Sequence, residues 1–136
     1  MPFKVCRKRR DGRLTSLYRF GSEMVEYRPR RWTRPQKGCG PLLAYADLDG
    51  PVWEIYWLSR DEHFTRPDIV VYEVEIEACT DQTQARWDLD GNREKPTHLW
   101  GRVILCDSIK LLRKACLDHC AQMRKAAGLN GHDFRL

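Results

Sequence analysis

The chain has 136 residues, of which 42% are hydrophobic and 32% are charged, with a formal net charge of +5. This composition excludes a collagen-like repeat, a transmembrane protein and a chain that is disordered throughout. The length predicts a single domain over residues 1–136, which buries roughly two-thirds of the surface that its unfolded chain exposes.

The sequence also bears on the compartment in which the protein works. It has no run of about 18 apolar residues, and its basic N-terminus lacks the apolar core of a signal peptide. Its six cysteines include no Cys-x-x-Cys pair and are too sparse for a disulfide scaffold. We therefore expect a cytoplasmic protein with reduced thiols and no contact with a membrane.

Charge is distributed unevenly along the sequence. Residues 1–40 carry a net charge of +9, residues 41–100 carry −8, and residues 101–136 carry +4. Clustered Lys and Arg favour an anionic partner such as nucleic acid. If the basic segments pack against the acidic middle of the same chain, however, much of this charge cancels internally. Both interpretations stay open.

The N-terminal third predicts a β-hairpin followed by an exposed loop. Apolar and polar residues alternate over 3–7, Asp11-Gly12 is a strong turn signal, and residues 14–20 would form the returning strand. Residues 28–35 contain four arginines and two prolines, which a buried strand would reject. This segment predicts an extended, exposed loop.

The middle of the chain predicts two strands, a helix and a loop. Residues 42–46 are a short apolar run typical of a buried strand. A helix over 51–60 is favoured by Pro51 in its first turn, although alternating apolar residues in this segment also permit a strand. Residues 69–79 predict a strand with apolar residues on one face and glutamates on the other, and residues 81–97 predict a long loop.

The C-terminal third predicts a strand over 99–106 and a long amphipathic helix over 108–127. Asp107 or Ser108 would cap this helix, and Gly128 would follow its end. Apolar residues recur at steps of three and four, as expected for a stripe that packs on a sheet: Ile109, Leu112, Cys116, Cys120, Met123 and Ala127.

A possible metal site lies on the same predicted helix. Cys116, His119 and Cys120 have the spacing that lets side chains on one helix share an ion. A zinc site would need a fourth ligand from a distant segment, and both cysteines belong to the apolar stripe, where a free cysteine packs as a small hydrophobe. Packing is therefore favoured, and we predict no metal and no cofactor.

Three glutamates suggest an enzyme as an alternative function. Glu73, Glu75 and Glu77 alternate along one predicted strand, with successive carboxylates roughly 7 Å apart, a separation that would suit acid–base or glycosyl-transfer chemistry. A strand that faces solvent has the same pattern, and no partnered histidine or nucleophile lies nearby in the sequence. An enzyme acting on a nucleotide or glycosidic substrate is thus the alternative to a binding function.

The arginine-rich loop indicates a binding surface. Arginine makes bidentate contacts with phosphate, aromatic rings stack on bases, and both residue types dominate protein-binding hot spots. The alternative is that Trp32 packs in the core and the arginines pair with the three glutamates. With the basic face of the last helix included, the predicted binding residues are Tyr27, Arg28, Arg30, Arg31, Trp32, Arg34, Lys110, Arg113 and Lys114.

Several short motifs resemble those of small proteins encoded by phages and prophages. They are Tyr27, Trp32-Thr33-Arg34-Pro35, Gly38-Cys39-Gly40-Pro41-Leu42-Leu43, Tyr72-Glu73-Val74-Glu75 and the run from Ile104 to Leu112. The likeness covers most of residues 3–113, implies a compact α+β domain of viral or mobile-element origin, and brings no catalytic residues. Residues 114–136 extend past such proteins, which would let the last helix contact a partner or form a dimer.

Together these features predict an α+β domain with a mostly antiparallel sheet, one short helix and a long C-terminal helix packed on the sheet. The expected function is that of a small basic phage-type binding protein. It would engage a host protein or nucleoprotein complex that handles nucleic acid or serves in defence, or nucleic acid itself, through the loop at 28–34. An anti-CRISPR-like inhibitor that blocks an anionic-ligand site would work in this way.

Overall fold

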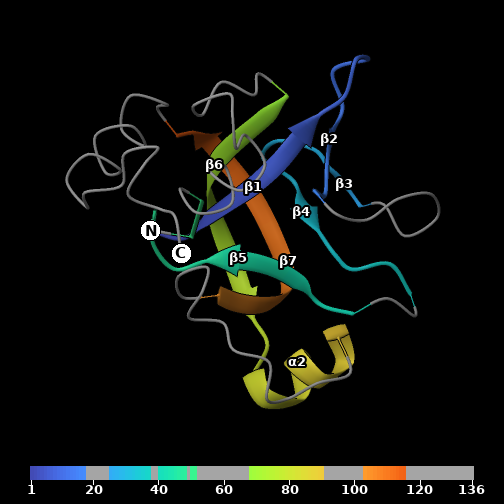
Figure 1. The fold of residues 1–136 in the computed structure, drawn as a ribbon, viewed down its shortest axis with the longest axis vertical. Helices are drawn as coiled ribbons and strands as arrows, with labels where there is room; N and C mark the ends of the chain where they lie inside the picture. Colours follow the sequence, from blue (N-terminus) through green and yellow to red (C-terminus); the bar gives the residue numbers. More distant parts are fainter. Residues whose placement is uncertain (18–24, 38–39, 49, 52–67, 91–102, 116–136) are drawn as a thin grey trace, which may run out of the picture.

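The computed structural model describes residues 1–17, 25–37, 40–48, 50–51, 68–90 and 103–115. These residues form a seven-stranded antiparallel sheet and one short helix (Figure 1). The strands are β1 (Phe3–Lys8), β2 (Leu14–Thr15), β3 (Glu26–Tyr27), β4 (Trp32–Thr33), β5 (Leu42–Tyr45), β6 (Ile69–Ala78) and β7 (Val103–Lys114), and the helix is α2 (Gln82–Asp90).

Four of the strands close into a barrel. β1 pairs with β6, β6 with β7 and β7 with β5, and the partners Phe3 and Tyr45 join β5 back to β1. Ile109 pairs with Ile76 of β6 on one side and with Thr33 of β4 on the other, so β4 lies on the same edge of β7 as β5. β2 and β3 extend the sheet from the end of β1.

The N-terminal hairpin is confirmed, with a shorter returning strand than predicted. Arg13 O accepts from Arg9 N–H at 2.8 Å, and Arg9 O accepts from Gly12 N–H at 2.9 Å, which closes a three-residue loop. Gly12 has a φ of 88°, a left-handed conformation that glycine adopts without steric cost. β2 covers only two residues of the predicted 14–20 strand, of which 18–20 lie outside the described residues.

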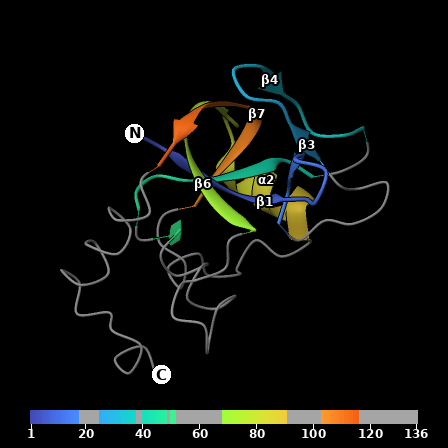
Figure 2. The same ribbon diagram turned by 90° about the horizontal axis from the view of Figure 1, so that it is seen from above.

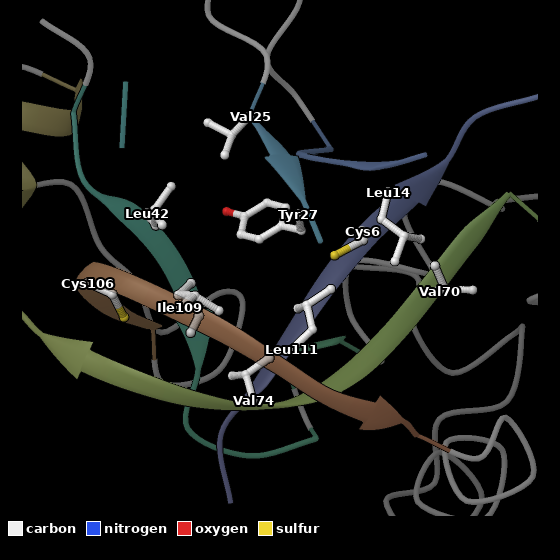
Figure 3. Packing of buried hydrophobic residues seen from close by; sticks show 11 residues of the cluster. Cys6, Leu14, Val25, Tyr27, Leu42, Val70, Val74, Cys106, Ile109 and Leu111 are labelled. Carbon is white, nitrogen blue, oxygen red and sulfur yellow. The ribbon is translucent and has the colours of Figure 1, made fainter. Parts of the chain in front are cut away.

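Side chains on opposite faces of the strands form two hydrophobic cores. In the first core, Tyr27 points from β3 toward Leu42 of β5 (Figure 3). The buried members of this first core are Cys6, Leu14, Val25, Tyr27, Leu42, Ala44, Val70, Val74, Cys106, Ile109 and Leu111. The second core contains Phe3, Val5, Leu17, Tyr45, Leu48, Ile69 and Val71. Because side chains alternate along a strand, one strand serves both cores.

The two predicted strands in the middle of the chain are confirmed. Residues 42–46 contain β5, and residues 69–79 contain β6, whose Val70 and Val74 face the first core as the alternation predicts. The helix or strand predicted over 51–60 lies outside the described residues beyond Pro51. No helix in the described part of the chain has the length and apolar character that a membrane crossing needs.

The predicted fold class is wrong, because residues 108–114 continue β7 instead of beginning a long helix. The pairing with β6 skips Asp107 and Leu112, which are inserted into β7 as two β-bulges. Consequently, the residues that face the first core follow one another at steps of 2, 3 and 2: Ile104, Cys106, Ile109 and Leu111. This mixed spacing hides the strand period. Residues 116–127 of the predicted helix lie outside the described residues.

The predicted loop over 81–97 is also wrong, because its first half forms α2. Asp81 caps this helix: its Oδ1 accepts from Gln84 N–H at 3.0 Å, and its carbonyl accepts from Ala85 N–H at 3.0 Å. The Gln82 amide docks the helix on Leu105 of β7, donating to its carbonyl at 2.8 Å and accepting from its N–H at 2.9 Å. Residues 91–97 lie outside the described residues.

We expect Leu111→Ala to lower the free energy of unfolding by about 2–5 kcal/mol, as for other fully buried leucines, and Leu112→Ala by about 1 kcal/mol. Leu111 is 1% exposed in the first core, whereas Leu112 is only half-buried on the bulge. Urea denaturation of the two variants measures this difference. In the predicted helix, Leu112 would lie on the buried stripe and Leu111 beside it. A larger loss of unfolding free energy in Leu112→Ala than in Leu111→Ala would therefore contradict the assignment of these residues to β7.

Candidate functional site

The loop between β3 and β4 is a tight turn fastened to β7. Arg31 N–H donates to Arg28 O at 3.1 Å, which places Pro29 and Arg30 at the centre of the turn. Proline suits the first central position because its ring fixes φ, and Arg30 has a φ of 64°, where glycine or asparagine is usual. Arg30 N–H donates to Leu111 O at 2.8 Å, so the turn has a defined position beside β7 (Figure 2).

The arginine side chains of this loop, and that of Arg34 directly after β4, face solvent. Arg28, Arg30, Arg31 and Arg34 are all exposed, and none of them forms an ion pair with any described residue. The alternative in which these arginines pair with the glutamates of β6 is therefore not observed among the described residues. Their guanidinium groups are accessible to an anionic partner.

Trp32 lies on the surface and not in the core. Its side chain is 42% exposed, and β4 pairs Trp32 with Lys110 of β7. Lys110 Nζ lies 5.7 Å from the centroid of the Trp32 ring, a cation–π distance. On its other side Lys110 pairs with Glu75 of β6, so one row of side chains crosses three strands.

The glutamates of β6 are engaged mostly by residues of β7. Glu73 accepts from Arg113 Nε, Glu77 accepts from the hydroxyl of buried Ser108, and Glu75 lies opposite Lys110. Two of the predicted binding residues, Lys110 and Arg113, therefore face carboxylates of the same chain. Carboxylates that meet basic or hydroxyl side chains of the neighbouring strand in this way give no observation in favour of the enzyme alternative.

Tyr27 is a predicted binding residue that the structure places in the core. It is 2% exposed, and Lys4 Nζ lies 5.3 Å from the centroid of its ring. Lys4 is itself buried and donates from Nζ to Leu43 O at 2.7 Å. Lys4, a polar position of the predicted alternating strand, thus points into the molecule. Of the two aromatic residues predicted to bind, only Trp32 is exposed.

A hollow of about 440 Å³ opens beside the loop. It includes Arg28 and Lys114, which the sequence predicted as binding residues, and Lys8 and Arg13, which it did not. We call it the basic hollow; its lining residues are Lys8, Asp11, Gly12, Arg13, Leu14, Glu26, Tyr27, Arg28, Pro29, Val70, Tyr72 and Lys114. Lys8 and Arg13 flank the hairpin turn, where a basic residue carries no signal of a site.

A second hollow, of about 460 Å³, contains a cysteine beside two carboxylates. Its lining includes Cys79, Asp88 and Asp107, and Cys79 Sγ donates to Asp107 Oδ1 at 3.3 Å. Burial, followed by this hydrogen bond, raises the pKa of Cys79 to about 11. The thiol is therefore protonated at neutral pH and is a poor nucleophile.

The other described cysteines are buried free thiols. Burial raises the pKa of both Cys6 and Cys106 to about 12. Within the described ranges no three His, Cys, Asp or Glu side chains gather as metal ligands would. The predicted alternative of a zinc site at Cys116, His119 and Cys120 lies outside the described residues.

Comparison of this chain with family models, curated proteins and solved structures finds no match. The resemblance to phage-encoded proteins stays a prediction.

We expect Cys79 in the folded protein to react with iodoacetamide about 100-fold more slowly at pH 8 than an ordinary thiol, because only the thiolate reacts and the Cys79 pKa is about 11 instead of 9.0. Below pH 11 the rate should rise about tenfold per pH unit. Mass spectrometry of alkylated peptides measures the rate, with the urea-unfolded chain as control. Equal rates in the folded and unfolded chains would contradict this environment.

Proposed function

We propose that this chain is a small basic binding protein that holds nucleic acid through the loop from Arg28 to Arg34. It would act in the cytoplasm of a host cell, on nucleic acid alone or within a host complex that handles nucleic acid or serves in defence. Arginine is suited to this task because its planar guanidinium makes paired hydrogen bonds with phosphate. Four such groups lie within seven residues of the sequence.

The observation that supports this proposal most directly is the conformation of Arg30. A residue with a side chain costs about 1 kcal/mol or more at a left-handed φ, a cost that glycine avoids. The Arg30 side chain is exposed and forms no ion pair with the described residues. Glycine at this position would stabilise the fold at least as well, so the guanidinium of Arg30 is better explained by binding to another molecule.

The loop is also held in place before any partner arrives. The turn is closed by Arg31 and Arg28, and it is fastened to β7 through Arg30 N–H and through the pairing of Trp32 with Lys110. A preorganised loop loses less conformational entropy on binding than a disordered one. Trp32, 42% exposed, adds a ring on which a base can stack next to the arginines.

We expect Arg30→Gly to separate stability from binding. Its free energy of unfolding should stay the same or rise by up to about 1 kcal/mol, because the left-handed strain is relieved. Its affinity for a single-stranded oligonucleotide should fall several-fold, and the dependence of log K on log salt should weaken by about 0.7, because one phosphate contact is lost. Urea denaturation and fluorescence anisotropy over a salt series measure the two effects.

Arg86→Gln is the matched control, because it removes the same charge from α2, outside the segment from Arg28 to Arg34. Its oligonucleotide affinity should stay within about twofold of the parent protein. Equal losses in both variants would show that net charge, and not the loop, controls binding. If the parent protein binds no oligonucleotide even at low salt, the proposal is wrong, and an acidic protein surface becomes the partner to test.

A further inference from the structure

We propose that the basic hollow binds the phosphate monoester of a nucleotide, with the nucleoside against its apolar wall. This inference rests on the proposed function, since it names the part of a nucleic acid that would be held beside the arginine loop. The same chemical group is carried by a free mononucleotide and by the 5′-phosphorylated end of a strand. The experiment below distinguishes these two sources.

Strand pairing assembles the hollow from distant parts of the sequence. Lys8 of β1 pairs with Leu14 of β2, and Leu14 pairs with Tyr27 of β3, so these three side chains share one face. Leu14 and Tyr27 belong to the first core, which means that Lys8 projects from the same face at the margin of that core. Lys114 reaches the hollow from the end of β7, where it pairs with Tyr72 of β6.

Two of the charges around the hollow neutralise each other. Arg13 Nε lies 2.8 Å from Asp11 Oδ2, and Arg13 N–H donates to Asp11 Oδ1 at 3.0 Å. The backbone hydrogen bond is the main cause that holds the pKa of Asp11 below its usual value, so this carboxylate stays ionised and occupied at neutral pH. Asp11 therefore does not compete for the remaining cations.

The charges that remain match the proposed ligand. Lys8, Arg28 and Lys114 form no ion pair with any described residue, and Glu26 is the one further carboxylate that lines the hollow. The balance is an excess of two positive charges. A phosphate monoester carries about −1.5 to −2 at pH 7, whereas an internal phosphodiester of a strand carries only about −1. The hollow therefore favours a terminal or free nucleotide phosphate.

The size and the walls of the hollow suit the rest of a nucleotide. Its volume of about 440 Å³ lies within the range of about 300–1,000 Å³ that small-molecule sites occupy. The half-buried ring of Tyr72, with the small exposed parts of Leu14 and Val70, supplies apolar surface for a base or sugar. Glu26 supplies a carboxylate that can accept from a sugar hydroxyl or from an amino group of the base.

The test uses the full-length protein and three probes: AMP, adenosine and inorganic phosphate. AMP at saturation should raise the Tm by about 3 °C or more, because a ligand that binds only the folded state stabilises it. Inorganic phosphate should have a smaller effect, and adenosine none at the same concentration. Equal effects of AMP and adenosine, or no effect of AMP, would overturn the proposal.

Variants assign the binding to the hollow. Lys8→Gln and Lys114→Gln should each weaken AMP binding about tenfold in isothermal titration, because each removes a cation that forms no ion pair with the described residues. Arg10→Gln is the matched control: Arg10 is exposed on the same hairpin but does not line the hollow, and its variant should bind AMP as the parent does. Two separate lysine variants keep the test informative if one of them fails to fold. Unchanged AMP binding in a folded lysine variant would overturn the site.

A 15-nucleotide single strand with either a 5′-phosphate or a 5′-hydroxyl identifies the source. Tighter binding of the phosphorylated strand, lost in the lysine variants, would show that a strand end enters the hollow. If AMP binds but the two strands bind equally, the ligand is a free mononucleotide. A third outcome separates the two proposals. If AMP does not bind, and both strands bind equally, lose affinity in Arg30→Gly and keep it in the lysine variants, the hollow proposal is wrong and the loop proposal stands. If AMP binds but neither strand does, the loop proposal is wrong and the hollow proposal stands.

Discussion

β7 is the element on which the rest of the structure depends, because it is hydrogen-bonded along both of its edges. One edge pairs with β6, and the other takes β5 near Cys106 and β4 near Ile109. The two inserted residues, Asp107 and Leu112, are bulges of the kind that bend a strand and increase its twist, which a barrel of so few strands requires. The same strand fixes the arginine loop through Leu111, so the geometry of the surface follows from the closure of the sheet.

The uneven charge of the sequence is used differently on two parts of the surface. On β6 and β7, acidic and basic side chains meet: Arg113 contacts Glu73, and Lys110 lies opposite Glu75. In the loop after β3, the arginines are exposed and form no ion pair with described residues. Internal cancellation and an outward-facing basic surface, which were alternatives at the level of the sequence, therefore occur in the same molecule. Whether a charged side chain is paired within the chain depends on which strands lie next to each other, and not on how far apart the residues lie in the sequence.

Local signals in the sequence predicted the parts of the fold that local chemistry controls. Asp11-Gly12 marked the hairpin, the alternation over β6 identified its buried face, and prolines among arginines marked an exposed segment. That segment is not the extended loop that was predicted, because it contains a tight turn and β4. β7 was mistaken for a helix because each bulge replaces a step of 2 by a step of 3, and only pairing with β6 reveals the insertions. α2 was missed because its signal is a polar cap at Asp81 without an apolar stripe. The basic hollow was missed because Lys8 and Lys114 are brought together only by long-range pairing.

Some charged side chains on the surface of the described residues form contacts that stabilise the fold, and others do not. Arg13 with Asp11 and Arg113 with Glu73 form contacts within the chain, and their loss would leave a partner uncompensated. Arg30 adopts a conformation that costs stability, and Lys8 and Lys114 add repulsion beside Arg28 that Glu26 offsets only in part. Departures from what folding alone favours tend to concentrate where a protein meets its ligand. Here they gather around one residue, Arg28, which belongs to both the loop and the hollow, so the two proposed contacts form one continuous surface for an anionic ligand.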